Sequence, residues 1–393
     1  MVPEGWKAYS LIDITKWSSG STPSKSENDF WGGDIPWISA VSMKGIFYSD
    51  SDLKVTEKAL KHSAKVANEN DILLLVRGSM LWNKIPVGIA TRAMAFNQDV
   101  KCIKANTKKV DVRFLLYWFL AKEKHLLGMV TGTGIGAGKL DTSELQSLDI
   151  YLPCLSEQKK IAKILSTWDN AIATTEKLIA TSQQQKKALM QQLLTGKKRL
   201  VNPETGKAFE GDWKKVELGK LLDYKQPTPY LVKSTEYSDE YPTPVLTAGK
   251  TFILGYSNED FGIFSEELPV IIFDDFTTAS KFVNFPFKAK SSAMKILIAK
   301  DGVSIKYVYE AMQVLNYPVG GHQRHWISIF ANLVIELPEP EEQQKIASVL
   351  TAADKEIELL QAKLAHLKDE KKALMQQLLT GKRRVKVDEN VAA

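Results

Sequence analysis

The sequence KKALMQQLLTGK occurs twice in this chain of 393 residues, at residues 186–197 and again at residues 371–382. The two copies are 185 positions apart. A repeat of this length that occurs only twice predicts two similar halves, each ending in the same kind of helix. The similarity extends upstream at the same offset, where Leu152-Pro153, Glu157-Gln158, Ile161-Ala162 and Leu165 match Leu337-Pro338, Glu342-Gln343, Ile346-Ala347 and Leu350.

Each copy closes a long segment in which apolar residues alternate in steps of four and three, a spacing typical of a coiled-coil seam. Gly196 and Gly381 follow where a left-handed residue ends a helix. Each helix would run about 38 residues, or about 57 Å. Lys371 interrupts the second seam, and the first turns polar in its middle. The apolar seam comprises Ile161, Leu165, Trp168 and Ile172, and Ile346, Leu350, Ile357, Leu360, Leu364 and Leu367.

A long helix with one apolar stripe needs a partner, and the other copy is the obvious one. The alternative is two amphipathic helices buried separately, although ordinary helices average only about 11–12 residues. We predict an α+β fold in which two globular α/β domains are separated by two long helices that form an antiparallel coiled coil with a pseudo-twofold repeat. The predicted segments are 1–152 and 201–336 for the domains, and 153–200 and 337–393 for the helices.

Composition sets only loose limits on function. The net charge of +6 permits a nucleic-acid partner but does not require one. Cys102 and Cys154 are too few for a disulfide framework, which suits a reducing cytoplasm. No apolar run approaches the roughly 18 residues of a membrane span, and the N-terminus lacks a signal-peptide pattern. We therefore expect a soluble, cytoplasmic protein.

Both globular domains show the same order of strand and helix patterns. Trp213-Lys214 repeats Trp6-Lys7, as if a second copy began there. The glycines and prolines of residues 30–38 predict a structured loop rather than a regular element. Apolar runs predict strands at 71–76, 87–91, 101–104 and 148–152, and at 245–247, 252–254, 269–273, 281–283, 294–298 and 333–337, with helices at 112–123 and 303–315.

A glycine-rich segment, residues 132–139, raises the possibility of a phosphate-binding loop. It fails the Walker pattern, because Thr133 stands where the first glycine belongs and Leu140 where Ser or Thr belongs. If this segment has a function, we expect its backbone amides and Lys139 to contact DNA phosphates. A plain structural loop is the alternative.

The second half carries a different loop at the equivalent position, with His322, Gln323, Arg324 and His325. Zinc needs three or four ligands, and no cysteine or third histidine lies near. Such side chains also read base edges, which is the role that we favour. Asp274-Asp275 with Lys281 could suggest a nuclease, but an Asp-Asp pair after a strand is more often a turn. No sequence of the form (Asn/Asp)-Pro-Pro-(Tyr/Phe) or helicase motif is present, so we predict no catalytic site and no metal site.

Taken together, the repeat, the stretch SSGSTPSK (18–25) with WGGDIPW (31–37), and the helix entries LP…EQKKIA and LP…EQQKIA resemble the specificity subunit of Type I restriction-modification systems. The resemblance spans essentially the whole chain. It implies two target-recognition domains, each reading one half of a split, asymmetric target in double-stranded DNA. It also implies that the helices set the spacing between the domains and bind two methyltransferase subunits.

The resemblance assigns chemistry to other subunits. Methyltransferase subunits would bind S-adenosylmethionine and methylate adenine, and a motor-nuclease subunit would use ATP and Mg²⁺, so no cofactor is expected in this chain. The family pattern points to the loop of Ser21, Thr22, Ser24 and Lys25. We add, as predicted DNA contacts, Arg77 and Lys139 in the first domain, and Lys225, Thr228, Lys281, His322, Gln323, Arg324 and His325 in the second.

Three alternatives stay open. The chain could serve a system whose methylase and nuclease form one polypeptide. It could be a coiled-coil scaffold that binds protein, which the weak net charge would permit. A stand-alone nuclease is the third. Steep salt dependence of DNA binding would distinguish a DNA-recognition subunit from a protein-binding scaffold.

Overall fold

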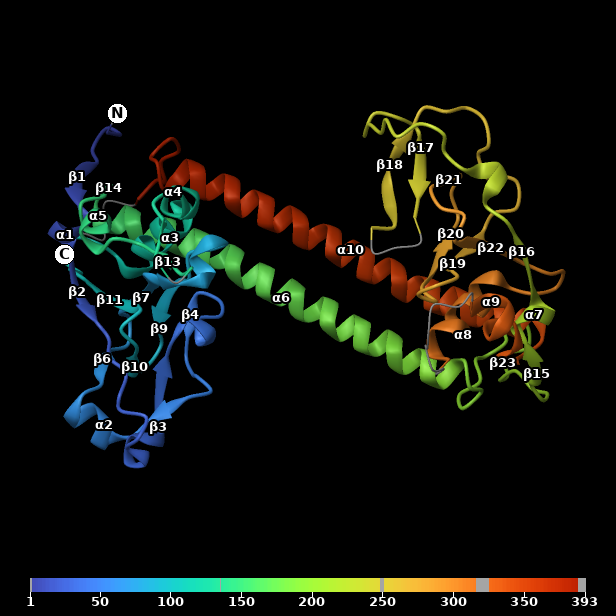
Figure 1. Cartoon of the computed structure of the whole chain (residues 1–393), viewed down its shortest axis with the longest axis horizontal. Coiled ribbons are helices and arrows are strands. Elements are labelled where there is room, and N and C mark those ends of the chain that lie inside the picture. The colour runs from blue at the N-terminus through green and yellow to red at the C-terminus, as the bar shows by residue number, and fades with distance from the viewer. Residues whose placement is uncertain (1, 135, 248–250, 316–324, 388–393) are drawn as a thin grey trace. The chain divides into compact units, whose positions relative to one another are not determined.

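The computed structural model describes residues 2–134, 136–247, 251–315 and 325–387. The chain forms two compact units, unit 1 from Met1–Thr175 with Lys363–Ala393 and unit 2 from Glu176–Ala362. Each unit therefore includes part of both long helices. Figure 1 shows the elements of each unit along the ribbon.

The two long helices have the predicted length. Helix α6 covers Leu155–Leu193 and helix α10 covers Pro340–Leu378, which is 39 residues each. Gly196 and Gly381 follow them with φ of +69°, the left-handed conformation expected after a helix end. The repeated sequence therefore ends both helices in the same way.

Contacts inside each unit show that α6 and α10 are antiparallel. In unit 1, Lys371 of α10 pairs with Asp169 of α6. In unit 2, Lys186 of α6 pairs with Asp354 and Ser182 bonds Glu356. Partners thus rise in number along one helix as they fall along the other. The predicted antiparallel coiled coil is confirmed.

Unit 1 is built around a buried five-stranded sheet with the order β2-β11-β7-β9-β4. Strand β7 is central, with β11 and β9 as its neighbours, and all four of its residues are buried. Helix α3 buries six consecutive residues, and Asp111 caps its start through the amides of Arg113 and Phe114. The strands of this sheet are β2 (Thr15–Ser19), β4 (Phe47–Tyr48), β7 (Ile72–Leu75), β9 (Val87–Ala90) and β11 (Val100–Ala105), and α3 is Val112–Ala121.

Three smaller sheets complete unit 1, with the orders β5-β3-β10-β6, β12-β13-β8 and β1-β14. Their strands are β1 (Lys7–Ser10), β3 (Trp31–Ile38), β5 (Lys54–Val55), β6 (Lys65–Ala67), β8 (Arg77–Gly78), β10 (Met94–Phe96), β12 (Thr131–Gly132), β13 (Gly138–Lys139) and β14 (Asp149–Leu152). Short helices are α1 (Leu11–Ile14), α2 (Glu57–His62), α4 (Glu123–Gly128) and α5 (Thr142–Gln146).

Unit 2 repeats this plan with different residues. Its sheets have the orders β16-β22-β19-β20, β18-β17-β21 and β15-β23. The strands are β15 (Lys214–Glu217), β16 (Leu222–Lys225), β17 (Thr243–Leu246), β18 (Ile253–Ser257), β19 (Val270–Asp274), β20 (Ser280–Val283), β21 (Lys288–Ala289), β22 (Met294–Ala299) and β23 (Val334–Leu337). The helices are α7 (Leu218–Leu221), α8 (Ile305–Val314) and α9 (His325–Ser328).

The same pairings recur in the same chain order, which defines the equivalent elements. The first strand of each unit pairs antiparallel with its last, β1 with β14 and β15 with β23. Strand β2 pairs with β11 as β16 does with β22. The sheet β5-β3-β10-β6 of unit 1 and the sheet β18-β17-β21 of unit 2 each contain a parallel pair, β3 with β10 and β17 with β21. The predicted repeat of two globular α/β domains is therefore confirmed, and α8 is the equivalent of α3.

The prediction of a structured loop rather than a regular element at residues 30–38 is wrong, because Trp31–Ile38 form strand β3. The strand tolerates its glycines because its pairing with β5 shifts register between Trp31 and Ile35. A Cβ at Gly33 would lie 2.5 Å from the carbonyl oxygen of Val55. A close strand contact, rather than a turn, therefore requires this glycine.

Among the described residues, no helix combines the length and the apolar composition needed to cross a membrane.

Candidate nucleic-acid interface

The predicted recognition loop of unit 1 leaves strand β2 at Gly20 and passes close to β10. A Cβ at Gly20 would lie 2.2 Å from the carbonyl oxygens of Phe96 and Asn97. Ser21 then donates its amide to the Phe96 carbonyl at 2.9 Å and its hydroxyl to the Ser63 carbonyl. Thr22 donates to Gln98 at 2.6 Å. The first half of this loop is therefore tied to the protein through its own polar groups.

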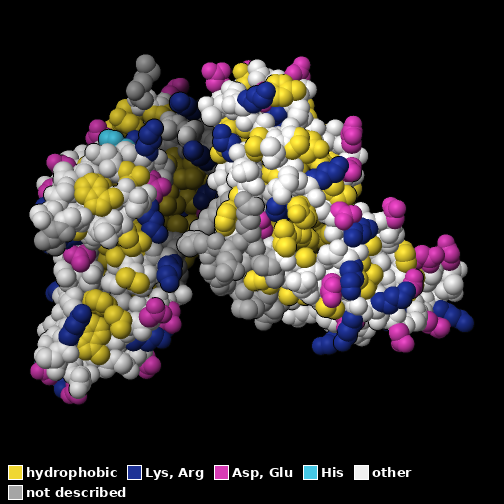
Figure 2. All heavy atoms as spheres, turned by 45° about the vertical axis from the view of Figure 1, so that its right-hand side comes forward, with side chains coloured by type: hydrophobic (Ala, Val, Ile, Leu, Met, Phe, Trp, Pro, Cys, Tyr) yellow, Lys and Arg dark blue, Asp and Glu magenta, His cyan; other side chains and the backbone are white. Residues whose placement is uncertain are grey.

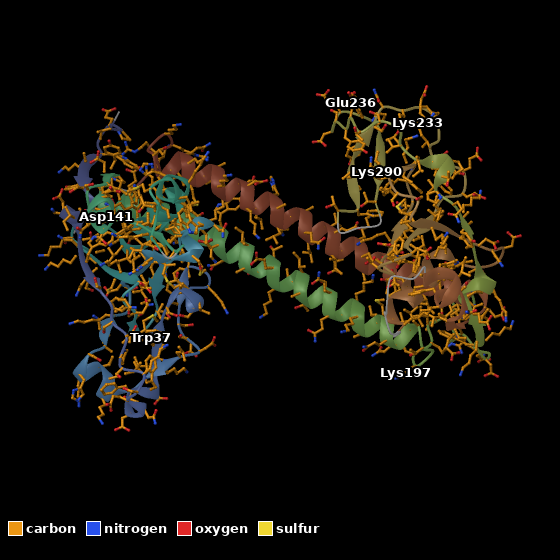
Figure 3. The ribbon with its side chains drawn as sticks, in the orientation of Figure 1. Trp37, Asp141, Lys197, Lys233, Glu236 and Lys290 are labelled. Carbon is orange, nitrogen blue, oxygen red and sulfur yellow. The ribbon has the colours of Figure 1, made fainter. Side chains whose placement is uncertain are left out.

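Two tryptophan side chains hold the loop through hydrogen bonds to its backbone carbonyls. The indole of Trp37 donates to the Ser21 carbonyl at 3.2 Å, and that of Trp31 donates to the Ser24 carbonyl at 3.0 Å. Their rings pack edge to face with centroids 5.3 Å apart, and both lie on strand β3, where Figure 3 labels Trp37. Ser24 and Lys25 remain exposed. Sequence reasoning missed the tryptophans as supports, although both lie in the stretch that carries the family resemblance.

The structure brings Arg77 and Lys139 together. They are direct partners on the antiparallel strands β8 and β13, and both are exposed. The described residues of the glycine-rich segment include the paired antiparallel strands β12 and β13, so the segment does not join a strand to a helix. Trp82 is 49% exposed, and its indole donates to the Gly136 carbonyl at 3.1 Å, which supports the segment from one side. Two cations thus stand on a small supported sheet, an arrangement suited to phosphate contacts.

In unit 2 the predicted contacts Lys225, Thr228 and Lys281 are also exposed. Lys225 ends β16 and pairs with Glu267, Thr228 begins a short 3₁₀ turn, and Lys281 lies on β20. His322, Gln323 and Arg324 lie outside the described residues. His325 begins α9, and its side chain also lies outside the description.

The repeated topology aligns loops that the sequence leaves unaligned. Residues after β16 occupy the place of the Ser21–Lys25 loop after β2. The amide of Val232 bonds the Ala289 carbonyl of β21 at 2.9 Å, as that of Ser21 bonds Phe96 of β10. Thr228 therefore belongs to the equivalent of the first recognition loop, and Lys225 ends the strand that leads into it.

Charged residues also lie beside the sheet β18-β17-β21 of unit 2, and sequence reasoning missed them. Lys233 lies over the ring of Phe261 at 4.8 Å, and Lys290 lies over that of Tyr237 at 5.8 Å. Figure 3 labels both lysines together with Glu236 beside β17 and β18. Charges of both signs therefore lie beside this sheet.

Unit 1 also has a hollow lined only by cationic and neutral residues. It measures about 470 Å³ and is lined by Lys16, Lys104, Lys108, Ala105, Asn106 and Thr107. Lys16 and Lys104 are direct partners on β2 and β11. No ion pair is found for Lys16, Lys104 or Lys108 among the described residues. Sequence reasoning missed this group because the two strands are more than 80 positions apart.

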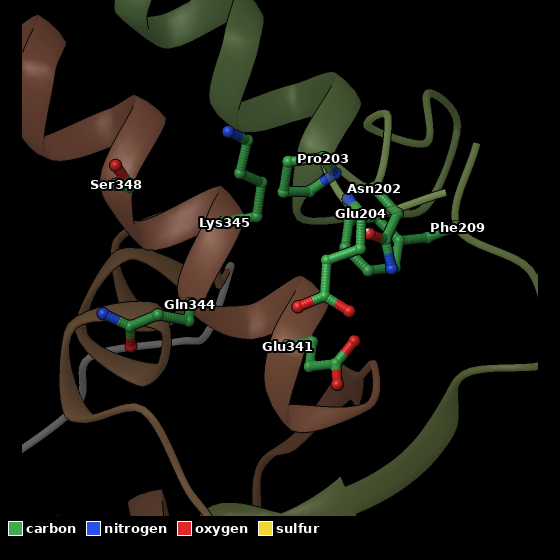
Figure 4. A pocket seen from close by; sticks show the side chains of 8 residues that line it. All are labelled: Asn202, Pro203, Glu204, Phe209, Glu341, Gln344, Lys345 and Ser348. Carbon is green, nitrogen blue, oxygen red and sulfur yellow. Dashed lines mark hydrogen bonds between the residues drawn. The ribbon is translucent and has the colours of Figure 1, made fainter. Parts of the chain in front are cut away.

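Two other hollows are mixed in charge. One of about 750 Å³ in unit 2 is lined by Lys220, Lys225 and Lys300 but also by Asp223, Glu267 and Asp301. Another lies between the connector after α6 and the first turns of α10, and Figure 4 shows the carboxylates of Glu204 and Glu341 pointing toward one another in it. On the face drawn in Figure 2, basic and acidic side chains are interspersed on both units.

The acidic pair Asp274-Asp275 forms a turn. Asp274 accepts from the amide of Phe276 at 2.9 Å and from the Thr277 hydroxyl at 2.6 Å, while Asp275 accepts from the Trp326 amide at 2.9 Å. Both carboxylates are thus engaged by backbone and hydroxyl donors. Within the described ranges, no cluster of His, Cys, Asp and Glu could hold a metal ion.

All residues of the predicted seam lie on the protected face of α6 or α10. Ile161, Leu165, Ile346 and Leu350 are fully buried. Trp168, Ile172, Ile357, Leu360, Leu364 and Leu367 are half-buried. The more protected members are those nearest the globular part of each unit.

Ionic and hydrogen-bond contacts also repeat between the units. Arg384 forms a two-pronged pair with the buried Glu157 in unit 1, and Arg199 does so with the buried Glu342 in unit 2. Hydrogen bonds to these carboxylates raise the pKa of both arginines. The segment after each long helix is therefore held by the same kind of ion pair to a glutamate in the first turn of the other long helix.

Known proteins resemble this chain in sequence. The family model described as Type I restriction modification DNA specificity domain matches residues 3–182 and 210–369. The specificity subunit of the Type I restriction enzymes EcoR124I/EcoR124II of Escherichia coli is 49% identical over 145 residues, which is 36% of this chain and 35% of that relative. The MjaVIII specificity subunit of Methanocaldococcus jannaschii is 28% identical, with 98% of this chain and 94% of that one covered.

A crystal structure of a Type I restriction-modification S subunit from M. genitalium has the same fold. The TM-score is 0.65 at 15% identity, with 96% of this chain and 99% of that chain covered. The two matched regions each contain one globular fold and the start of a long helix. This chain therefore belongs to the family of Type I restriction-modification specificity subunits and carries two copies of the family's domain.

Proposed function

We propose that this chain recognises a bipartite, asymmetric sequence in double-stranded DNA, with one half-site read by each unit. The observation that carries the proposal is the pair of units with one topology and different loops. Equivalent folds with unlike side chains suit two readers of two unlike targets. In unit 1 the reading surface would comprise the Ser21–Lys25 loop and the Arg77–Lys139 sheet.

The long helices would serve as the spacer between half-sites. Each is a continuous helix of 39 residues, or about 58 Å at 1.5 Å per residue. Half-sites one helical turn apart lie about 34 Å from each other. A helix pair of this length is long enough to set such a spacing without reading bases itself.

The proposal leaves bond-making and bond-breaking to partner subunits. Two methyltransferase subunits would bind along the helix region and use S-adenosylmethionine, and a motor-nuclease subunit would use ATP and Mg²⁺. The hydrogen-bonded turn at Asp274-Asp275 supports a non-catalytic role for that pair. The family to which the chain belongs supports the same division of work.

The direct test is selection from a pool of random duplexes by this chain reconstituted with a cognate methyltransferase subunit. We expect enrichment of two short motifs separated by a fixed gap. Affinity should fall steeply with salt, with a slope of about −0.9 per neutralised phosphate. The purified chain alone, incubated with Mg²⁺ and DNA, serves as the control for catalysis.

Two results would overturn the proposal. One is enrichment of a single uninterrupted motif or of none, with binding that barely responds to salt. A protein-binding scaffold would then be the better account. The other is covalent change of DNA by the chain alone, which would make it an enzyme.

A further inference from the structure

Three helices of unit 1 meet at a buried ionic contact, which we call junction 1. Its residues are Tyr117 of α3, Asp169 of α6 and Lys371 of α10. Lys371 pairs with Asp169 at 2.5 Å, and their side chains are only 15% and 21% exposed. The Tyr117 hydroxyl donates to the other carboxylate oxygen of Asp169 at 2.6 Å. The Lys371 ammonium also lies 5.4 Å from the centre of the Tyr117 ring.

Unit 2 has a second such contact, junction 2, made by Lys186 of α6, Asp354 of α10, and Lys306 and Glu310 of α8. Lys186 pairs with Asp354 at 2.6 Å and with Glu310 at 3.1 Å. Lys306 pairs with Asp354 at 2.9 Å and with Glu310 at 2.6 Å. The Glu310 side chain is fully buried, and the two lysines are 16% and 14% exposed. Two cations and two anions thus neutralise each other.

The two junctions are related by the internal repeat. Asp354 lies 185 positions after Asp169, and Lys371 lies 185 positions after Lys186. Each repeat therefore supplies the acid of one junction and the lysine of the other. These lysines occupy seam positions where the pattern otherwise places apolar residues. The third helix differs, because α3 offers a phenol and α8 offers a charged pair.

We propose that the two junctions couple the globular fold of each unit rigidly to the long helices, and that this rigidity makes the protein selective for one gap between half-sites. The inference rests on the proposed function and adds specificity-determining residues to it. Tyr117, Lys306 and Glu310 join the globular fold to the helix pair through directional contacts. Each is a positioning group, because none is placed at the reading surface.

The physical reason is the difference between apolar and ionic contacts. Apolar burial is non-directional and roughly proportional to the area removed from water, so an apolar contact constrains orientation less than an ionic one. A buried charge that leaves its partner is left desolvated and unpaired, which is costly. Polar groups at single seam positions are known to fix register at some expense of stability. If the junction residues were all apolar, the contact between the globular fold and the long helices would be stable but its orientation would be poorly fixed.

The test therefore uses variants in which apolar side chains replace the ionic contacts. These variants should keep the stability of the fold but lose the directional contacts between the globular fold and the long helices. Y117F/D169L/K371L converts junction 1, and K186L/D354L severs junction 2 while leaving the Lys306–Glu310 pair within α8. K215L/E336L, at an exposed pair on β15 and β23, is the matched control. Melting temperatures of the full chain should stay level or rise, because well-packed apolar residues often replace a buried pair without loss of stability.

The first readout is methylation of target duplexes by the chain reconstituted with its methyltransferase. Duplexes carry the correct gap, or a gap one base pair longer or shorter. We expect each junction variant to lower the discrimination between correct and altered gaps by at least about threefold, within the range of coupling between contacting groups. Discrimination against a single mismatched base within a half-site should be unchanged. K215L/E336L should behave as the parent on both counts.

The second readout needs no DNA. Spin labels at K61C on α2 and A365C on α10, both exposed sites of unit 1, report the coupling within that unit in a C154S background. The distance distribution should be narrow in the parent and broader in Y117F/D169L/K371L. An unchanged distribution together with unchanged gap discrimination would refute the inference. If the parent itself showed no gap discrimination, the spacer proposal would fail instead, and the spin-label result would still decide the rigidity of junction 1.

Discussion

At the scale of single residues, the contacts that matter most are buried polar groups with fixed partners. In the first recognition loop, indole and hydroxyl donors hold backbone carbonyls, so Ser24 and Lys25 are presented from a braced segment. In junction 2, burial opposes ionisation of Asp354, but hydrogen bonds from Lys186 and Lys306 outweigh it and lower the pKa of this carboxyl. The charge of Asp354 is therefore stabilised by folding.

This shift predicts an acid-sensitive contribution to the stability of unit 2. A carboxyl with a lowered folded pKa stabilises the fold above its unfolded pKa of about 4, and the contribution is lost as pH falls through the folded pKa. Urea unfolding of D354N should show the largest deficit against the parent at neutral pH and a shrinking deficit below about pH 4. A control D239N, at an exposed carboxylate, should match the parent throughout. A deficit for D354N that stayed constant with pH would contradict the assignment.

At the scale of elements, adjacent strands gather cations that are distant in sequence. Lys16 on β2 and Lys104 on β11 stand opposite one another, and Lys108 completes the hollow beside them. Like charges side by side on a sheet repel. A polyanion that neutralised them would relieve this repulsion, so the β2–β11 face is a candidate for phosphate contacts.

The K16A/K104A variant should weaken DNA binding on every sequence alike, because phosphate contacts carry no base information. The slope of log affinity against log salt should become shallower by about 0.9 for each phosphate that the variant no longer neutralises. K214A/K215A removes two lysines that already pair with Glu339 and Glu336, and it should leave the slope unchanged. A weakening confined to one half-site sequence would show that Lys16 and Lys104 act in base recognition instead.

At the scale of the whole molecule, two compact folds share two continuous helices. The seam repeats every seven residues, so a heptad can be duplicated without exposing apolar side chains. Two ion pairs hold the segments that follow the helices, Arg384 with Glu157 and Arg199 with Glu342. Both pairs lie outside the central part of the helices. The helix length is therefore separable from the structure of either fold.

Duplicating residues 174–180 of α6 together with residues 361–367 of α10 should lengthen the preferred gap by about three base pairs. Seven residues add about 10.5 Å of helix, and each base pair adds about 3.4 Å. Methylation mapping on a library of gap lengths measures the shift, and both half-site motifs should stay the same. Seven residues inserted at Gly206 of the exposed connector provide the control, with no expected change. New half-site motifs with an unchanged gap would refute the role of the helices as a spacer.

Local pattern alone was sufficient for much of the architecture. The repeated KKALMQQLLTGK segment and the 3.5-residue spacing predicted both long helices, their glycine ends and their pairing with one another, because helix geometry ties side-chain direction directly to sequence spacing. Apolar runs located ten of the 23 strands of the described residues, for the same reason. Strand β3 is among those missed, since the need for glycine came from a neighbouring strand, which no local pattern contains.

Partners distant along the chain were decided only by tertiary structure. The pairing of Arg77 with Lys139, the lysine hollow at β2 and β11, and the attachment of α3 and α8 to the long helices all depend on strand order and helix packing. The equivalence of the loops after β2 and β16 likewise emerged from repeated strand pairing, since their residues have diverged. Sequence spacing determines which face a side chain takes, whereas long-range packing determines what that face meets.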